Sequence, residues 1–390
     1  MPMFVCMVWT LIIGADVLTG KGKRQHAYLL AFMLAATLLY LGHCVYFNHT
    51  TSVVPVTDTV YCFCNLAVYP LYYLYICSLT LRRDEMRLQA LMLLPAVVAA
   101  IVVGILYLTM TSEETTTFIN NYLYRGSHAH TTRIELAQMV AHDFCKVAFA
   151  VLIIPVFILG SLHIRRFNKL VRSVYADIDD RTLAPIHSLL VAFVVTSAMS
   201  FVFSIIGRHH FAGSFWLLAI PSTLFSCLLF IIGYLSHRQQ FSIQDIESDE
   251  RKADSQVPAA PGIAELRERI ELLMEKEQMF RQPNLKIVDL VQRLNSNRNY
   301  IYLAINGEMG MTFNEYVNRL RVEYAAKLMR QFPDKNLSQI ADQSGFASST
   351  SFYRNFRQYK GVSPKDYAIG GGTKRGKQPT TDTPNPNEEP

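Results

Sequence analysis

Seven apolar segments, each close to the length that an α-helix needs to cross a bilayer, limit the folds open to this chain. They are residues 3–19, 26–47, 58–80, 89–109, 144–162, 187–207 and 216–236. Stretches such as VAFAVLIIPVFILG are apolar around the whole helix, which a soluble core helix seldom needs. A spanning β-barrel would instead require short segments of alternating polarity. The sequence therefore predicts an all-α chain that begins with a seven-helix transmembrane bundle.

Lysine and arginine collect in alternate loops of this bundle, and this bias predicts its orientation because such residues favour the cytoplasmic side. Eleven lie on one side: Lys21, Lys23, Arg24, Arg82, Arg83, Arg87, Arg165, Arg166, Lys169, Arg172 and Arg181. Three lie on the other: Arg125, Arg133 and Arg208. The first segment has no basic flank before it, so we expect an uncleaved helix. The chain is expected in a bacterial inner (cytoplasmic) membrane, with its N-terminus outside and its C-terminal part cytoplasmic.

Sulfur-containing and ionisable side chains in the apolar part form no recognisable reaction centre. All seven cysteines precede residue 237 without the Cys/His spacing of zinc sites, so no metal or cofactor is predicted. A disulfide among Cys44, Cys62 and Cys64 is left open. Ionisable residues in or near the spans either reach the membrane interface or line a ligand pocket; they are Asp16, His43, His142, Asp143, Lys146 and His187. Because nucleophile and paired-carboxylate motifs are absent from the sequence, an enzyme is not expected.

The composition changes from apolar to charged after residue 237. Residues 237–262 are polar and end in Pro, Ala and Gly, a composition typical of a linker. As a flexible coil this linker would reach about 25–30 Å. Residues 263–370 form the predicted soluble domain, and residues 371–390, rich in Pro, Thr and Gly, are expected to be disordered.

The soluble domain has helical periodicity in two similar halves. Helices are expected at 263–280, 285–295, 297–310, 312–331, 336–346 and 348–361. In each half a short helix, a turn and a second helix follow one another, and the helix over 312–331 joins the halves. Two such units on one rigid helix can address two successive major-groove segments of DNA. The first helix could also serve as the seam of a homodimer.

Several motifs of these halves carry a resemblance to a known family. They are IADQSGF, SFYRNF, KGVSPKDY and, in the connecting helix, FNEYVNRLRVEYAAKLM. Through them residues 263–367, about a quarter of the chain, resemble the DNA-binding domain of AraC-type transcription regulators. The resemblance implies a double helix-turn-helix fold, sequence-specific promoter binding and, in most members, activation of transcription. The apolar part lies outside it, since most members carry a soluble sensory domain instead.

The candidate DNA-binding residues lie at the exposed start of each recognition helix, where side chains reach base edges. They are Arg298, Asn299 and Tyr302 in the first unit, Thr350, Ser351 and Arg354 in the second, and Arg357 and Lys360, which are better placed for phosphates. Residues 281–370 contain 13 Lys and Arg against 7 Asp and Glu, an excess that phosphate binding requires. Leu303, Gly307 and Glu308 depart from the basic pattern of the family, so the first unit is expected to bind DNA weakly or to orient the second.

The sequence therefore predicts a membrane-anchored transcriptional regulator with a sensory membrane bundle. Its expected partners are double-stranded promoter DNA, the lipid bilayer, RNA polymerase and an unidentified small-molecule or envelope stimulus. The alternative is a membrane receptor or transporter whose helical tail docks a protein. Release of the DNA-binding part by proteolysis after about residue 240 is a further alternative.

Overall fold

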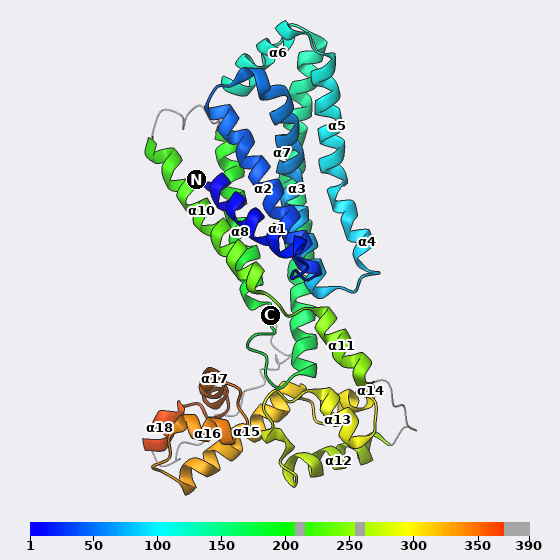
Figure 1. The fold of residues 1–390 in the computed structure, drawn as a ribbon, viewed down its shortest axis with the longest axis vertical. Coiled ribbons are helices and arrows are strands. Elements are labelled where there is room, and N and C mark those ends of the chain that lie inside the picture. Colours follow the sequence, from blue (N-terminus) through cyan, green and yellow to red (C-terminus); the bar gives the residue numbers. More distant parts are fainter. Residues whose placement is uncertain (207–214, 254–261, 370–390) are drawn as a thin grey trace, which may run out of the picture. The chain divides into compact units, whose positions relative to one another are not determined.

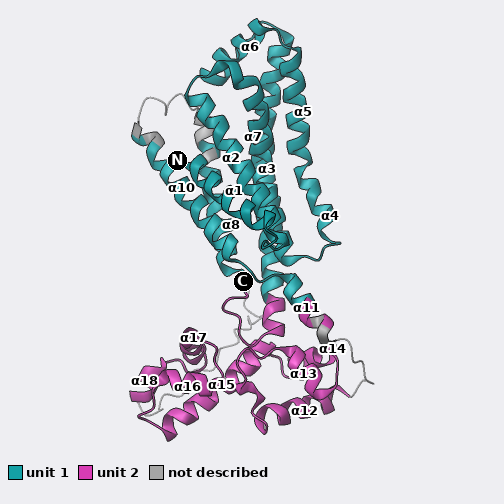
Figure 2. Cartoon of the chain, viewed as in Figure 1, with its two compact units in different colours: residues 1–168, 182–247 teal, residues 169–181, 248–390 magenta. Residues whose placement is uncertain are grey.

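The computed structural model describes residues 1–206, 215–253 and 262–369, and every regular element among them is a helix. The β-bridge between Tyr175 and Lys286 is isolated from any named strand in this part of the chain. The prediction of an all-helical chain is therefore confirmed for the described residues. The chain divides into two compact units (Figure 2). Unit 1 comprises residues 1–168 and 182–247, and unit 2 comprises residues 169–181 and 248–390.

Unit 1 is a bundle of long helices (Figure 1). Its elements are α1 (Pro2–Leu18), α2 (Arg24–Phe47), η1 (Thr51–Val53), α3 (Val54–Thr80), α4 (Met86–Gln89), η2 (Ala90–Leu93), α5 (Leu94–Thr109), α6 (Ser112–Phe118), η3 (Ile119–Tyr124), α7 (Arg133–Val174), α8 (Ala184–Ile206), α10 (Phe215–Arg238) and the start of α11 (Ile243–Ala253). Helix α3 packs against α2 and α5, and its residues Tyr72, Tyr73 and Tyr75 have no exposed surface. Helix α3 is thus the core of the bundle.

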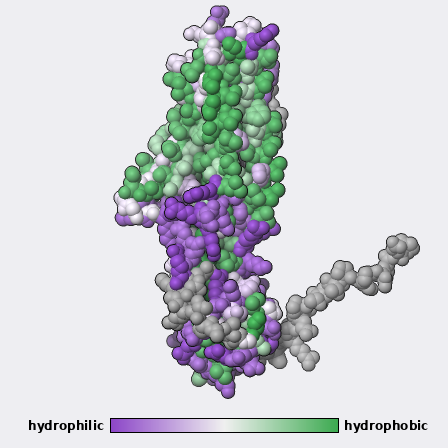
Figure 3. Space-filling view, turned by 90° about the vertical axis from the view of Figure 1, so that its right-hand side faces the viewer, coloured by the Kyte–Doolittle hydropathy of each residue, from purple (hydrophilic) through white to green (hydrophobic). Residues whose placement is uncertain are grey.

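The outer helices of unit 1 expose apolar side chains. On α5, for example, Leu94, Ile101, Ile105 and Leu108 are all exposed. Hydrophobic residues accordingly cover most of the visible surface of these helices (Figure 3). An apolar surface of this extent is unfavourable in water and favourable in the hydrocarbon region of a bilayer.

Five helical segments among the described residues are long and apolar enough to cross a membrane. They are Arg24–Phe47, Thr51–Thr80, Met86–Thr109, Arg133–Val174 and Ala219–Asp249. Two further apolar helices, Pro2–Leu18 and Ala184–Met199, are shorter. Helices thus occupy all seven predicted places, but length and apolarity single out five rather than seven.

Helix α7 is much longer than the predicted span at 144–162, since it runs for 42 residues from Arg133 to Val174. The polar residues that flank the apolar stretch include no glycine or proline that would stop a helix there, so the helix continues through them. The segment before α7 contains α6. At the start of α6, Thr111 and Glu114 form a reciprocal capping box.

The cysteines and ionisable residues of unit 1 resolve the alternatives left open above. All seven cysteines are described, and none forms a disulfide; Cys62 and Cys64 lie inside α3. The Asp16 carboxylate is 2.7 Å from Nε2 of His237 near one end of the bundle. His43, His142 and Lys146 instead line a cavity of unit 1.

The expected linker at 237–262 is partly helical. Helix α11 occupies Ile243–Ala253, and the backbone N–H and hydroxyl of Ser242 donate to Asp245 at its start. A flexible coil over this whole segment is therefore wrong, because these residues provide their own helix start. Residues 254–261 of the linker and the expected disordered tail lie outside the described residues.

Unit 2 begins with the last residues of α7, resumes at Ser248 inside α11 and continues with further helices (Figure 1). They are α12 (Ile263–Glu275), η4 (Met279–Arg281), α13 (Ile287–Leu294), α14 (Arg298–Tyr302), η5 (Leu303–Glu308), α15 (Phe313–Gln331), α16 (Leu337–Gln343), α17 (Ser349–Lys360) and α18 (Pro364–Ile369). The predicted helix over 297–310 is in fact a short α-helix, α14, followed by the π-helical turn η5.

Candidate nucleic-acid interface

Two helix-turn-helix units are present, α13–α14 and α16–α17, and α15 joins them. In the second unit, Ile340 and Ala341 of α16 form a buried cluster with Phe352 and Phe356 of α17 and with one face of α15. The turn between α16 and α17 contains Gly345, whose φ of +85° is unfavourable for other residues. A Cβ atom there would lie 2.5 Å from the carbonyl oxygen of Arg281, so the turn requires glycine.

Side-chain caps begin both second helices. The Asn297 side chain accepts a hydrogen bond from the Tyr300 N–H at 3.0 Å, as the predicted start at Ser296-Asn297 requires. The Ser348 hydroxyl accepts one from the Ser351 N–H at 3.1 Å and starts α17. Helix α17 ends at Gly361, whose φ is +75°. The two candidate recognition helices are thus defined by local sequence.

The predicted residues of the second unit lie in different environments. Thr350, Arg354 and Arg357 are exposed on α17. Lys360 is half-buried and its ammonium lies 2.6 Å from the Glu323 carboxylate. Ser351 is buried, and its hydroxyl accepts a hydrogen bond from Nδ2 of Asn355 in the same helix at 3.3 Å.

In the first unit, Asn299 and Tyr302 are exposed and Arg298 is half-buried. Leu303, the apolar residue noted in the sequence, is 44% exposed at the start of the π-helical turn. The exposed face of α14 is therefore short and less polar than that of α17.

Sequence reasoning missed one part of this domain: residues 175–181, the α7–α8 loop, which lie in unit 2. The carbonyl oxygen of Ala176 accepts hydrogen bonds from the side chains of Asn314 and Asn318 of α15. The Ala176 N–H donates to the Leu285 carbonyl at 3.0 Å. These contacts join the loop to the connecting helix α15 and to the segment just before α13.

Asp177 of the α7–α8 loop forms a buried ion pair with Arg321 of α15. The distance from Nη1 to Oδ1 is 2.9 Å, and the Arg321 side chain has no exposed surface. Burial lowers the pKa of the Arg321 guanidinium, and the Asp177 carboxylate opposes that decrease. The other carboxylate oxygen of Asp177 accepts the Asn284 N–H at 2.9 Å. A buried charge needs this degree of pairing to be tolerated.

Asp179, two residues further along the same loop, contacts the start of α17. Its carboxylate lies 2.5 Å from Nη2 of Arg354 and 3.3 Å from the Ser348 hydroxyl. A carboxylate is thus held against the arginine that the sequence singled out for base contact. A guanine edge or a phosphate would use the same guanidinium donors. Only the spacing of acidic residues in DIDD could have drawn attention to this loop.

Comparison with known proteins agrees with this geometry. Residues 290–368 match the model of a family described as a helix-turn-helix domain. The melibiose operon regulatory protein of Escherichia coli is 32% identical over 83 residues, which make up 21% of this chain and 27% of that protein. The probable transcriptional regulator LumQ of Photobacterium leiognathi is 33% identical over 86 residues, 22% of this chain and 34% of that protein.

A further relative, the Msm operon regulatory protein of Streptococcus mutans, is 26% identical over 84 residues, 22% of this chain and 30% of its own length. The chain thus spans about a third or less of the length of these relatives. No solved structure matches it significantly. The relatives are described as regulators and not as enzymes, and the similarities identify residues 290–368 of this chain as a helix-turn-helix domain of the AraC type.

Proposed function

We propose that the chain is a membrane-anchored regulator that binds promoter DNA through unit 2. In this proposal unit 1 spans the cytoplasmic membrane of a bacterium seven times, with the N-terminus outside, and senses a stimulus there. The observation that carries the proposal is the presence, in one chain, of an AraC-type helix-turn-helix domain and of five helices apolar enough to cross a bilayer. The uneven distribution of Lys and Arg between alternate loops supports the orientation.

The proposed DNA surface is the exposed face of α17 with a smaller contribution from α14. Thr350 and Arg354 face the bases, Arg357 and Lys360 contact phosphates, and Asn299, Tyr302 and Arg298 extend the surface on the first unit. Ser351 is left out because it is buried. Arginine is the residue best suited to guanine, since its guanidinium donates two parallel hydrogen bonds.

Binding of genomic DNA fragments by the full-length protein in lipid nanodiscs tests this proposal. We expect selective retention of some fragments, weakening steeply between two salt concentrations. Arg354→Ala should reduce the affinity for a selected fragment about 5- to 150-fold, the range expected for losing one bidentate base contact. Arg267→Ala is the matched control, since Arg267 is an exposed arginine of α12 that pairs with Glu271. Failure to retain any fragment at low salt would favour the role of a protein-docking tail.

The α7–α8 loop gives this proposal a route from stimulus to DNA. Asp179 and DNA compete for the guanidinium of Arg354, so movement of the loop would change the affinity of α17 for its site. The side chains of the pair are 50% and 30% exposed, and such pairs contribute about 1 kcal/mol or less. The contact therefore adjusts DNA affinity by a modest factor and does not abolish binding.

Asp179→Asn should accordingly raise DNA affinity by up to about fivefold, the equivalent of roughly 1 kcal/mol. Asp180→Asn is the matched control, because it removes the same charge from the neighbouring exposed residue. In an Arg354→Ala background the Asp179→Asn change should have no further effect. Equal increases for Asp179→Asn and Asp180→Asn would show that only the net charge matters and would contradict the competition.

A further inference from the structure

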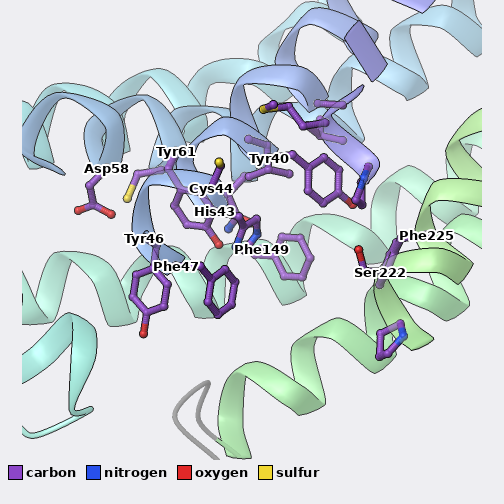
Figure 4. Close-up of a pocket in the computed structure, with 18 of the residues that line it drawn as sticks. Tyr40, His43, Cys44, Tyr46, Phe47, Asp58, Tyr61, Phe149, Ser222 and Phe225 are labelled. Atoms are coloured by element: carbon purple, nitrogen blue, oxygen red, sulfur yellow. The ribbon is translucent and has the colours of Figure 1, made fainter. Parts of the chain in front are cut away.

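Unit 1 contains a partly open cavity of about 780 Å³ between its helices. Its lining is mostly aromatic and aliphatic, as Tyr40, Phe47, Phe149 and Phe225 illustrate (Figure 4). Asp58 lies at one end of the row of labelled residues, and Ser222 and Phe225 lie at the other (Figure 4). A carboxylate in such a lining is expensive unless it has strong partners. Asp58 therefore needs such partners at its end of the cavity.

Three side chains of different chemistry meet at this end. Asp58 and Cys62 are one turn apart on α3, and His142 faces them from α7. Their ligand atoms, a carboxylate oxygen, a thiol sulfur and an imidazole nitrogen, all lie within 4.8 Å of one another. Nε2 of His142 is 2.7 Å from Oδ2 of Asp58, and these two side chains are only 8% and 12% exposed. We infer that Asp58, Cys62 and His142 form a binding site for a divalent transition-metal ion, with Zn²⁺ as the best fit.

The surrounding hydrogen bonds orient these groups as a metal site requires. Nδ1 of His142 lies 2.8 Å from the carbonyl oxygen of Gln138, so this nitrogen carries the proton and donates it. Nε2 faces Asp58 and is hydrogen-bonded to its carboxylate. A metal ion would displace the shared proton and bind at this nitrogen. The hydroxyl of Tyr107 donates to Oδ2 of Asp58 at 2.7 Å. Carboxylates and imidazoles that bind metals are usually held by partners of these kinds.

A fourth ligand is within reach on α7. Cys145 lies one turn after His142, and its side chain lies close to that of Cys62. Both cysteines and His142 line the cavity, as does Asp58. The fourth position is taken either by the Cys145 sulfur or by a molecule that enters from the cavity. The first arrangement is that of structural zinc sites, and the second is that of sites with an open position.

The donor set selects the class of metal. Thiolate and imidazole favour zinc and its neighbours in the transition series, whereas Mg²⁺ and Ca²⁺ require oxygen ligands. Donor atoms about 2.0–2.3 Å from a tetrahedral ion are roughly 3.3–3.8 Å apart. In this structure Nε2 of His142 and Oδ2 of Asp58 are 2.7 Å apart, and no two of the three ligand atoms are more than 4.8 Å apart. These distances lie on either side of the range for a tetrahedral ion. Side-chain adjustments of about an ångström would thus suffice.

Metal content and cobalt absorbance of the full-length protein in detergent test the site. The protein is purified without a polyhistidine tag, equilibrated with Zn²⁺, freed of loosely bound ions and analysed by elemental mass spectrometry. We expect about one zinc per chain, and with Co²⁺ a thiolate-to-cobalt charge-transfer band. Cys62→Ser and His142→Gln should each reduce the retained metal by more than tenfold, and Cys62→Ser should remove or shift the band.

Two controls separate metal binding from loss of fold. Cys227→Ser changes an exposed cysteine of α10, and Asp143→Asn changes an acid on α7 that pairs with Lys146, so both should retain the metal. Helical circular dichroism and elution volume show whether each variant is folded. If wild-type protein retains no more metal than Cys62→Ser, or if no charge-transfer band forms, the inference is wrong. These readouts do not involve DNA, so they stand apart from the proposed function.

Discussion

Arg321 shows how one side chain organises the helix-turn-helix domain. Its Nε donates to the Phe280 carbonyl at 2.8 Å, its Nη2 donates to the Gln282 carbonyl at 2.7 Å, and its Nη1 pairs with Asp177. The two carbonyls belong to the segment between α12 and α13, and Asp177 belongs to the α7–α8 loop. One buried guanidinium on α15 thus holds together segments that are distant in sequence.

Removing the carboxylate partner should destabilise this domain strongly. Asp177→Ala leaves a fully buried guanidinium without its counter-charge, and such a loss costs about 3–5 kcal/mol. The effect is measured by heating the full-length protein and recording the temperature at which a protease begins to cut within residues 262–369. Protection from the protease reports folding of this domain. Asp180→Ala, a change at an exposed neighbour, should leave the protection unaltered. Equal protection of the two variants would mean that Asp177 contributes little.

At the scale of elements, the two candidate recognition helices differ. Helix α17 has 12 residues and a capped start, whereas α14 has five residues before the chain enters a π-helical turn. Fewer side chains of α14 than of α17 can therefore reach base edges in the major groove of DNA. The sequence hinted at this difference through Leu303, Gly307 and Glu308.

We therefore expect unequal effects from the two helices. Asn299→Ala should reduce affinity for a selected DNA fragment by less than about tenfold. A base contact contributes roughly 1–3 kcal/mol of discrimination, and we expect a contact made by α14 to contribute an amount near the lower limit of that range. Arg354→Ala should have the larger effect. Titration of both variants against the same fragment in nanodiscs decides the order. A larger loss for Asn299→Ala would make α14 the principal reading helix.

Helical periodicity explains what could be predicted. Ile340, Ala341, Phe352 and Phe356 fall inward because their spacing alone defines one face of each helix. Asn297 was likewise recognisable as a helix start. The packing of Asp177 on Arg321 could not be predicted, because it joins residues 144 positions apart and depends on tertiary complementarity.

At the scale of the whole molecule, the compact units do not follow the order of the chain. Unit 2 takes residues 169–181 from between two apolar helices. A fragment that begins after residue 240, whether made by expression or by proteolysis, therefore lacks the Asp177 carboxylate. Such a fragment contains the whole helix-turn-helix sequence, but it lacks residues 169–181, which contribute the buried Asp177 side chain to the same compact unit.

This arrangement predicts complementation in trans. Residues 241–390 expressed alone should unfold at lower temperature than the same region in the full chain. The fragment lacks Asp177, so Arg321 loses its ion pair. A synthetic peptide of residues 169–183 should raise the melting temperature in a concentration-dependent manner. The same peptide with Asp177→Asn should be much less effective. A fragment already as stable as the intact protein would contradict the structural role of the loop.

The position of the α7–α8 loop inside unit 2 also restricts how this protein can arise by recombination of genes. A fusion that joined residues 262–369 to an unrelated receptor would transfer a basic side chain into the interior without its acidic partner. The recipient would have to supply an equivalent acid, or the arginine would have to be replaced by an apolar residue. Exchange of receptors upstream of this domain should therefore leave compensating changes at the position of Arg321.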